Sequence, residues 1–72
     1  MKKGNIYKIN KTIHHGDLIL RNNKFFKIDN IGFETITLLV GEPFVYDYNN
    51  DVTLEKSYFL QCLKNGTFQK WA

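Results

Sequence analysis

The two histidines of the chain are adjacent and stand just before an aspartate, in the stretch His14-His15-Gly16-Asp17. Imidazole and carboxylate groups are common zinc ligands, so this stretch is the first candidate for a metal site. Adjacent side chains on an extended backbone point in opposite directions, and one histidine with Asp17 supplies only two of the three or four ligands that zinc needs. The pattern favours a loop, and we expect no bound metal or cofactor.

A second candidate is the segment Asp47-Tyr48-Asn49-Asn50-Asp51, whose side-chain oxygens alternate as in the opening of a calcium-binding loop. The match fails further along, because the sixth position is Val52, where such loops have glycine. The twelfth position is Tyr58, where they have a bidentate glutamate. A hairpin turn therefore accounts better for this segment than a calcium site does.

Cys62 is the only cysteine, so the chain cannot form an internal disulfide. If the region is helical, Cys62 shares an inward face with Tyr58, where a thiol behaves as a small apolar group. The five glycines are scattered, so there is no glycine-rich phosphate loop, and no pair of carboxylates has a spacing typical of acid–base catalysis. We expect a core cysteine and no enzymatic activity.

Basic residues interleaved with aromatic rings occupy residues 1–28, where Asp17 is the only acid. Lysines could follow a phosphate backbone while Tyr7 or Phe25 stacks on a base. The pI of about 9.1 permits such binding, whereas the presence of a single arginine speaks against it, because arginine is preferred for bidentate phosphate contacts. The candidate nucleic-acid-binding residues are Lys8, Lys11, Arg21, Lys24, Phe25 and Lys27.

Acidic residues gather in the middle of the chain, since residues 29–51 contain no lysine or arginine. Part of this region is rich in tyrosine, a residue that is frequent at protein interfaces because its ring gives rigid, amphipathic contact area. Acids around such rings would complement a basic partner, including the nucleic-acid-binding groove of another protein. The leading hypothesis is therefore a protein-binding surface made of Glu42, Phe44, Tyr46, Asp47, Tyr48 and Asp51.

Short runs of apolar and β-favouring residues, separated by turn signals, predict an all-β fold. Asn22-Asn23 tolerates the positive φ angles of a tight turn, so the two runs beside it are expected to form a hairpin. In the second run Phe26 and Ile28 share one face, while Phe25 and Lys27 share the other. The expected elements are an edge strand at 4–10, a loop at 12–17, a hairpin of 18–22 with 24–31, a strand at 33–40, and a second hairpin of 44–48 with 52–54 across 49–51.

Residues 54–65 fit either a helix or a strand. As a helix, they place Tyr58, Phe59, Cys62 and Leu63 on one face, and Asn65-Gly66 supplies a stop signal. As a strand, they would pair with the residues from Thr67 to Trp71. We favour a short helix at about 56–64 before a closing strand, and this order of elements resembles the general plan of SH3-like small barrels.

The chain of 72 residues is expected to form one domain, residues 1–72, close to the size at which a single core only just stabilises a fold. The prediction is a small SH3-like barrel of five to seven short antiparallel strands with one short helix before the last strand. No signal peptide or membrane span is recognisable, so a cytoplasmic location and no membrane contact are expected.

We expect a non-catalytic binding protein with a protein partner, and the alternative is a nucleic-acid-binding small barrel. Small stand-alone domains with segregated charges and no catalytic residue resemble accessory proteins of phages and other mobile elements. Some of those inhibit host defence enzymes or other nucleic-acid-handling proteins. A homodimer through an exposed edge strand is a further hypothesis, because so small a chain gains stability by association.

Overall fold

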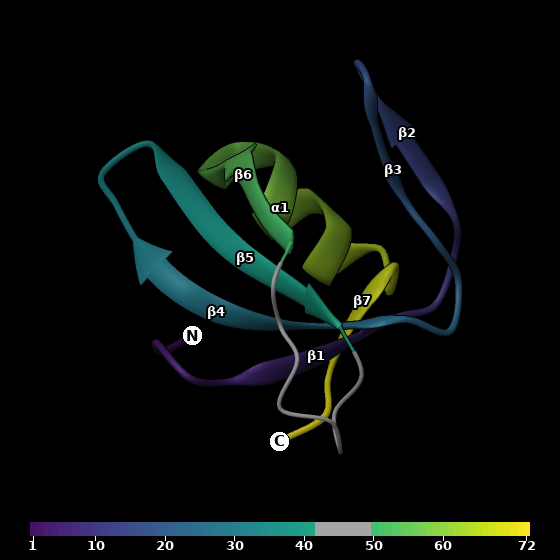
Figure 1. Ribbon diagram of the computed structural model, residues 1–72, viewed down its shortest axis with the longest axis horizontal. Helices are drawn as coiled ribbons and strands as arrows, with labels where there is room; N and C mark the ends of the chain where they lie inside the picture. Colours follow the sequence, from purple (N-terminus) through teal and green to yellow (C-terminus); the bar gives the residue numbers. More distant parts are fainter. Residues whose placement is uncertain (42–49) are drawn as a thin grey trace.

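The computed structural model describes residues 1–41 and 50–72, which form short strands and one helix (Figure 1). Most elements are only three to seven residues long, as expected of a chain with frequent turn signals. In chain order the elements are β1 (Ile6–Ile9), β2 (Ile13–His15), β3 (Leu18–Leu20), β4 (Phe25–Ile31), β5 (Thr35–Gly41), β6 (Asn50–Glu55), α1 (Lys56–Lys64) and β7 (Phe68–Lys70).

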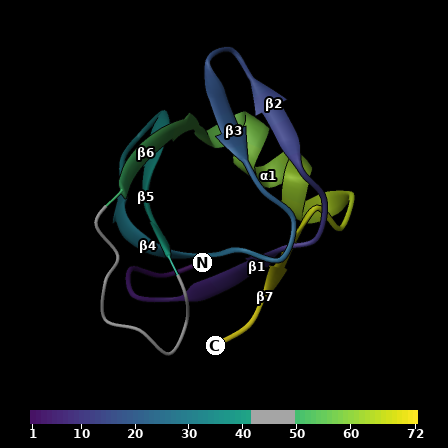
Figure 2. The ribbon, with the colours of Figure 1, turned by 45° about the vertical axis from the view of Figure 1, so that its right-hand side comes forward.

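Five of the strands form one antiparallel sheet in the order β6-β5-β4-β1-β7, and β2 pairs with β3 in a separate hairpin. Figure 2 shows the five-stranded sheet curving around the interior, with α1 and the β2–β3 hairpin on the remaining side. Among the described strands, β6 and β7 are the two edges and do not pair with each other. The prediction of a mostly β domain with one short helix before its last strand is confirmed.

The core forms because alternate residues of each strand point to the inner face of the curved sheet. In β4, for example, Phe26 and Ile28 are completely buried, as their alternation predicts, whereas Phe25 and Lys27 lie on the opposite face and are partly exposed. The described buried apolar residues are Tyr7, Ile9, Leu20, Phe26, Ile28, Ile36, Leu38, Leu54, Phe59, Cys62 and Phe68.

Aromatic rings fill the centre of this core. The ring of Phe59 lies 5.7 Å from that of Tyr7, 5.9 Å from that of Phe26 and 5.5 Å from that of Phe68, measured between centroids. The contacts with Tyr7 and Phe26 are edge to face, a geometry that contributes about 0.5–1.5 kcal/mol beyond the burial of area. Phe59 therefore packs the helix against β1 and against the two strands that flank it, β4 and β7.

Helix α1 covers the core with one face, as the spacing of its apolar residues predicts. Phe59 and Cys62 are buried, and Tyr58 and Leu63 are partly buried. The helix ends where the backbone N–H of Asn65 donates to the carbonyl of Gln61 at 3.0 Å and Gly66 takes a φ of +82°. The prediction of a helix at 56–64 is confirmed.

The expected hairpin across Asn22-Asn23 is wrong. β3 pairs with β2 across Gly16-Asp17, a region expected to be a loop, and Gly16 has the positive φ of +63° that this turn needs.

Asn23 also has a positive φ, 67°, but it forms a corner instead of a hairpin. Its N–H donates to the carbonyl of Ile9 at 2.8 Å, and the Ile9 N–H donates to the carbonyl of Lys24 at 2.9 Å. These bonds align β4, the expected second strand of that hairpin, with β1 instead of with β3.

The strand at 4–10 was expected at an edge, but β1 lies between β4 and β7. The expected strand at 33–40 begins only at Thr35, because the Gly32 N–H donates to the Thr35 carbonyl at 2.8 Å and closes a turn. That turn leaves the Phe33 side chain 93% exposed.

The expected second hairpin is only partly described. Its predicted turn at 49–51 is wrong for Asn50 and Asp51, which belong to β6 and pair with β5. Its first arm, residues 44–48, lies outside the described residues. The described part of the chain contains no helix with the length and apolarity needed to cross a membrane.

Candidate nucleic-acid interface

The outer face of β1 and β4 presents three of the predicted nucleic-acid-binding residues side by side. Because Tyr7, Ile9, Phe26 and Ile28 point into the core, the residues between them point outward. Lys8 is paired with Phe25, and Lys27 stands two residues along β4, opposite Ile6. The alternation of the sequence thus brings Lys8, Phe25 and Lys27 together on one surface.

Trp71 completes this surface from the other side of β1. The Trp71 N–H donates to the Ile6 carbonyl at 2.7 Å, which holds the residue beside β1 just after β7. Its ring meets the Phe25 ring edge to face, with centroids 5.3 Å apart and an interplanar angle of 67°. The Lys8 ammonium lies 5.9 Å from the centroid of the Trp71 ring, within cation–π range. We call Lys8, Phe25 and Trp71 the aromatic–lysine cluster.

Trp71 was missing from the predicted set, although it is 49% exposed and the chain has only one tryptophan. The signal in the sequence was a lysine and a tryptophan at a strand end, Lys70-Trp71, which is too common to single out. Only the pairing of β7 with β1 shows that Trp71 and Lys8, far apart in sequence, share a face.

The remaining predicted basic residues, Lys11, Arg21 and Lys24, are all exposed. Their backbone segments lie close together at the base of the β2–β3 hairpin, where the Asn22 N–H donates to the Thr12 hydroxyl at 2.9 Å and the Lys24 N–H to the Arg21 carbonyl at 3.3 Å. The bonds between Ile9 and the corner at 23–24 join that base to the end of β1. The backbones that carry the six predicted residues are therefore neighbours in space. Lys24 and Lys27 also interact with other residues of the molecule.

Tyr7 cannot stack on a base as the sequence suggested, because it is only 3% exposed. Its ring stacks on Phe26 with centroids 5.4 Å apart and an interplanar angle of 13°. Burial raises the pKa of its hydroxyl above the ordinary value of 10.0. Tyr7 is a core residue, and Trp71 is the exposed ring beside Lys8.

The predicted protein-binding surface falls almost entirely outside the described residues. This holds for Glu42, Phe44, Tyr46, Asp47 and Tyr48. The one described member, Asp51, is exposed on β6, where it is paired with Leu39 of β5.

The histidines lie on β2, where they point to opposite sides of the strand. His14 is exposed, whereas His15 stacks on Tyr58 of α1 with ring centroids 4.1 Å apart. In residues 1–41 and 50–72, no group of three or more His, Cys, Asp or Glu side chains is placed to hold a metal ion.

Cys62 is buried, as predicted, at 3% exposure. Burial raises the pKa of its thiol, and a hydrogen bond with the Tyr58 side chain acts in the opposite direction. For Tyr58 itself, burial is the main cause of a raised pKa, and its interaction with Cys62 adds to the shift. The thiol is thus protonated near neutral pH and shielded from solvent, which suits a core residue.

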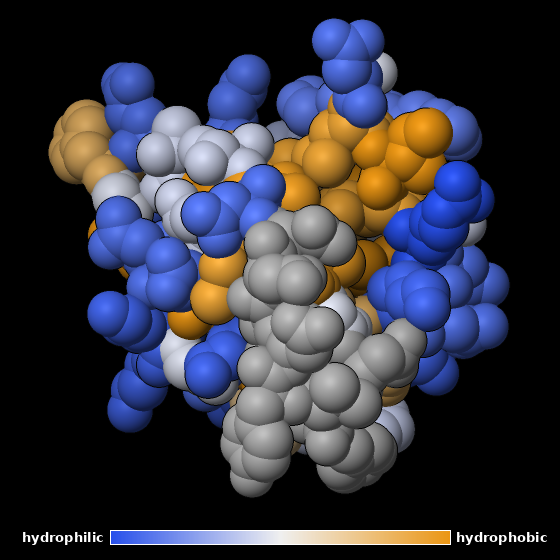
Figure 3. All heavy atoms as spheres, viewed as in Figure 1, coloured by the Kyte–Doolittle hydropathy of each residue, from blue (hydrophilic) through white to orange (hydrophobic). Residues whose placement is uncertain are grey.

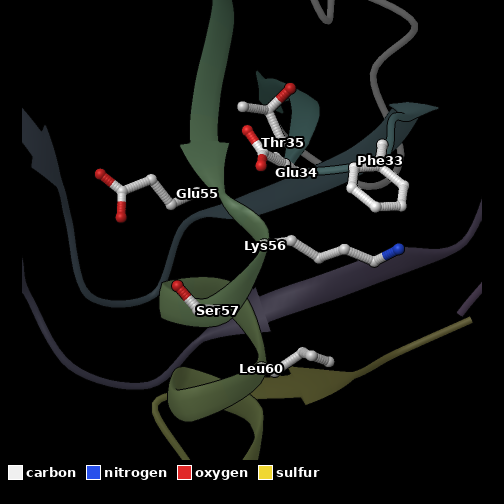
Figure 4. Close-up of a pocket in the computed structure, with 7 residues that line it drawn as sticks. All are labelled: Phe33, Glu34, Thr35, Glu55, Lys56, Ser57 and Leu60. Carbon is white, nitrogen blue, oxygen red and sulfur yellow. The ribbon is translucent and has the colours of Figure 1, made fainter.

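A shallow groove of about 620 Å³ lies between the β4–β5 turn and the junction of β6 with α1 (Figure 4). Figure 4 shows the Glu55 and Ser57 side chains on one side of the ribbon and those of Lys56 and Leu60 on the other. The Lys56 ammonium donates to the Gly32 carbonyl at 3.5 Å. The lining residues are Phe33, Glu34, Thr35, Glu55, Lys56, Ser57 and Leu60.

No protein-family model, curated protein or solved structure matches this chain. The geometry of its own residues is therefore the basis for a functional proposal.

Proposed function

We propose that the protein binds single-stranded nucleic acid through the aromatic–lysine cluster. The observation that carries this proposal is the position of Trp71, whose half-exposed ring is held edge to face by Phe25 with the Lys8 ammonium beside it. An exposed ring held rigidly next to a cation offers a base a stacking surface and its phosphate a counter-charge.

The single-stranded form is favoured because a base must leave its helical stack before a protein ring can cover its face. Stacking of a base on an aromatic side chain contributes about 1–3 kcal/mol and depends little on which base is present. Lys11 and Arg21, exposed at the base of the β2–β3 hairpin, would extend the contact along the phosphate backbone. Binding should therefore be weakly sequence-specific and sensitive to salt.

We also infer that the fold follows the SH3-like small-barrel plan. The curved antiparallel sheet and the helix directly before the last strand support this inference. Small β-barrels serve many functions, so this likeness is compatible with the proposed function but does not single it out.

Protein–protein interaction through the acidic, tyrosine-rich segment around 42–51 stays a prediction, as does a role as an inhibitor from a phage or mobile element. Such a partner could itself handle nucleic acid. A direct binding measurement separates the two functions, because it uses the purified protein alone.

The test is fluorescence anisotropy with labelled single-stranded and double-stranded DNA and RNA at two salt concentrations. We expect micromolar or tighter binding to single strands at low salt, weaker binding to duplexes, and a steep loss of affinity as salt rises. Absence of binding to every single-stranded probe at low salt would overturn the proposal.

A matched pair of variants locates the surface. Lys8→Gln should weaken binding and lower the salt dependence by roughly one phosphate contact, because the removed charge lies in the cluster. Lys64→Gln removes the same charge from the exposed end of α1 and should leave affinity within about twofold of the wild type. Equal effects of the two variants would show attraction by net charge alone.

A further inference from the structure

Among the described strands, β6 is a long edge of the sheet. It has six residues, Asn50–Glu55, and pairs with β5 in an unbroken register from Thr35↔Glu55 to Val40↔Asn50. Natural edge strands are usually shortened, bulged, or protected by proline or by charged side chains, above all lysine. β6 contains no lysine or proline, and its charged side chains are those of Asp51 and Glu55. The other edge, β7, is only three residues long and contains Lys70.

Among residues 1–41 and 50–72, the partner strand of β6 is β5. Within the described residues, no backbone hydrogen bond from outside β5 reaches residues 51–54. In Figures 1 and 2 the β2–β3 hairpin stands on the side of β6 away from β4 and β5. Figure 3 shows apolar side chains gathered on the surface toward that hairpin. A strand added to β6 would pair with its free backbone groups and lie next to this apolar surface.

The side chains of β6 indicate what kind of strand fits. Leu54 is buried and Val52 is partly buried, whereas Asp51, Thr53 and Glu55 are exposed. Figure 4 shows the Glu55 carboxylate pointing away from Phe33 and Lys56. The outward face of the edge is therefore acidic, and an added strand with basic outward residues and apolar inward residues would complement both faces.

A second copy of this chain complements the charges of the edge less well than a basic segment does. Antiparallel pairing of β6 with itself must keep the inward residues on the inner face. Two such overlaps span five residues each: one centred on Thr53 places Asp51 opposite Glu55 of the other copy, and one centred on Val52 places Asp51 opposite Thr53. Like charges directly opposite each other destabilise a strand pair. The first overlap is therefore disfavoured, and neither overlap gives Asp51 or Glu55 the opposite charge that a basic segment would supply.

We propose that the β6 edge captures an extended segment of a partner protein in which basic and apolar residues alternate, adding a sixth strand to the sheet. The contact lies at the opposite edge of the sheet from the aromatic–lysine cluster, so it is independent of nucleic-acid binding. The sequence predicted a protein partner from its acidic region, residues 29–51. Such a partner would be held at β6 by main-chain hydrogen bonds, and Asp51 and Glu55 would favour a basic one.

The test uses three capped, fluorescently labelled hexapeptides as probes. The first alternates lysine and valine, the second has the same composition in two blocks of three, and the third alternates glutamate and valine. We expect the alternating lysine peptide to bind about tenfold or more tightly than either of the others, because only it matches both the pleat and the charge of β6. Failure of this peptide to bind, or equal binding of the block peptide, would overturn the proposal.

Two double variants locate the contact. Asp51→Lys with Glu55→Lys should lose affinity for the lysine peptide by about tenfold or more and gain affinity for the glutamate peptide. Asp17→Lys with Asp29→Lys makes the same change of charge at solvent-accessible positions away from β6 and should bind the lysine peptide within about threefold of the wild type. Equal losses in both variants would contradict docking at β6.

Amide exchange and sedimentation supply readouts that do not depend on affinity. Peptide binding should slow amide exchange in residues 51–54 and leave that of β7 unchanged. Protection confined to β7 would overturn the proposal. A concentration-dependent dimer of the free protein with protected β6 amides would overturn it as well, in favour of a second copy.

Discussion

The ring of His15 lies flat against that of Tyr58, with centroids 4.1 Å apart and an interplanar angle of 22°. This contact joins the β2–β3 hairpin, which belongs to a separate two-stranded sheet, to the helix that covers the core. A two-stranded hairpin is marginally stable alone, so its position depends on such contacts and on the burial of Leu20.

His15→Ala should therefore loosen the hairpin and lower the free energy of unfolding by about 0.5–1.5 kcal/mol, the usual contribution of one stacked ring pair. The matched control is His14→Ala, since His14 is the same residue type on the same strand but is exposed. Urea unfolding gives the free energies, and amide exchange in residues 13–20 gives the loosening. Equal destabilisation by the two variants would show that the stacking contributes nothing.

Trp71 should report directly on nucleic-acid binding, because it is the only tryptophan and its ring is half exposed. Stacking of a base on the ring should quench its fluorescence in proportion to the bound fraction. Trp71→Ala should weaken binding by about 1–3 kcal/mol, and Trp71→Phe should recover part of that loss. Quenching without any loss of affinity in Trp71→Ala would place the contact near Trp71 but not on it.

Phe59→Ala should remove most of the protein's free energy of unfolding. Phe59 is completely buried between Tyr7, Phe26 and Phe68, and removal of such a ring costs about 3–5 kcal/mol. Domains are commonly stable by only about 5–15 kcal/mol, and small ones lie near the lower limit. Leu60→Ala, the next position on the same helix, is 47% exposed in the wild type and should cost about 1 kcal/mol or less. Circular dichroism during thermal unfolding compares the two variants.

Stability should decline at alkaline pH. Burial raises the pKa of the Cys62 thiol above its ordinary value of 9.0, so the folded state holds this proton more tightly than the unfolded chain does. The resulting stabilisation is fully present below pH 9.0 and is lost as the pH rises through the folded-state pKa. Tyr7 and Tyr58, whose pKa values burial also raises from 10.0, act in the same direction at higher pH.

Urea unfolding between pH 7 and pH 11 checks this dependence. Cys62→Val keeps an apolar side chain in the core and removes the titrating thiol, so its stability should fall less steeply just above pH 9 than that of the wild type. Parallel curves for the two proteins would show that Cys62 does not contribute to the decline.

Much of the candidate interface follows from local sequence. Lys8, Phe25 and Lys27 share an outer face because their neighbours Ile9, Phe26 and Ile28 are large and apolar, and a strand must turn alternate residues to opposite sides. The same kind of rule placed the helix at 56–64, where apolar residues recur every three to four positions and Asn65-Gly66 ends the run. Both rules act over a few residues, so neither needs knowledge of the rest of the fold.

The partners of the strands required the tertiary structure. Asn22-Asn23 and Gly16-Asp17 are both good turn sequences, but only the second joins two paired strands. The difference is whether the two runs beside the turn bond to each other or to β1. Beside Asn22-Asn23, the Ile9 N–H of β1 donates to the Lys24 carbonyl, and the run that follows pairs with β1. This choice depends on hydrogen bonds and burial between residues far apart in the chain, which no local pattern encodes.

The sequence by itself thus determined a small β-rich domain, the position of its helix, and the inward and outward faces of β4, because periodicity and turn chemistry are local properties. Only the tertiary structure decided that β1 is a central strand, that Tyr7 is buried, that Trp71 joins Lys8 and Phe25, and that β6 is left as an acidic edge. Those features arise when segments distant in sequence compete for the same backbone hydrogen bonds and the same buried space.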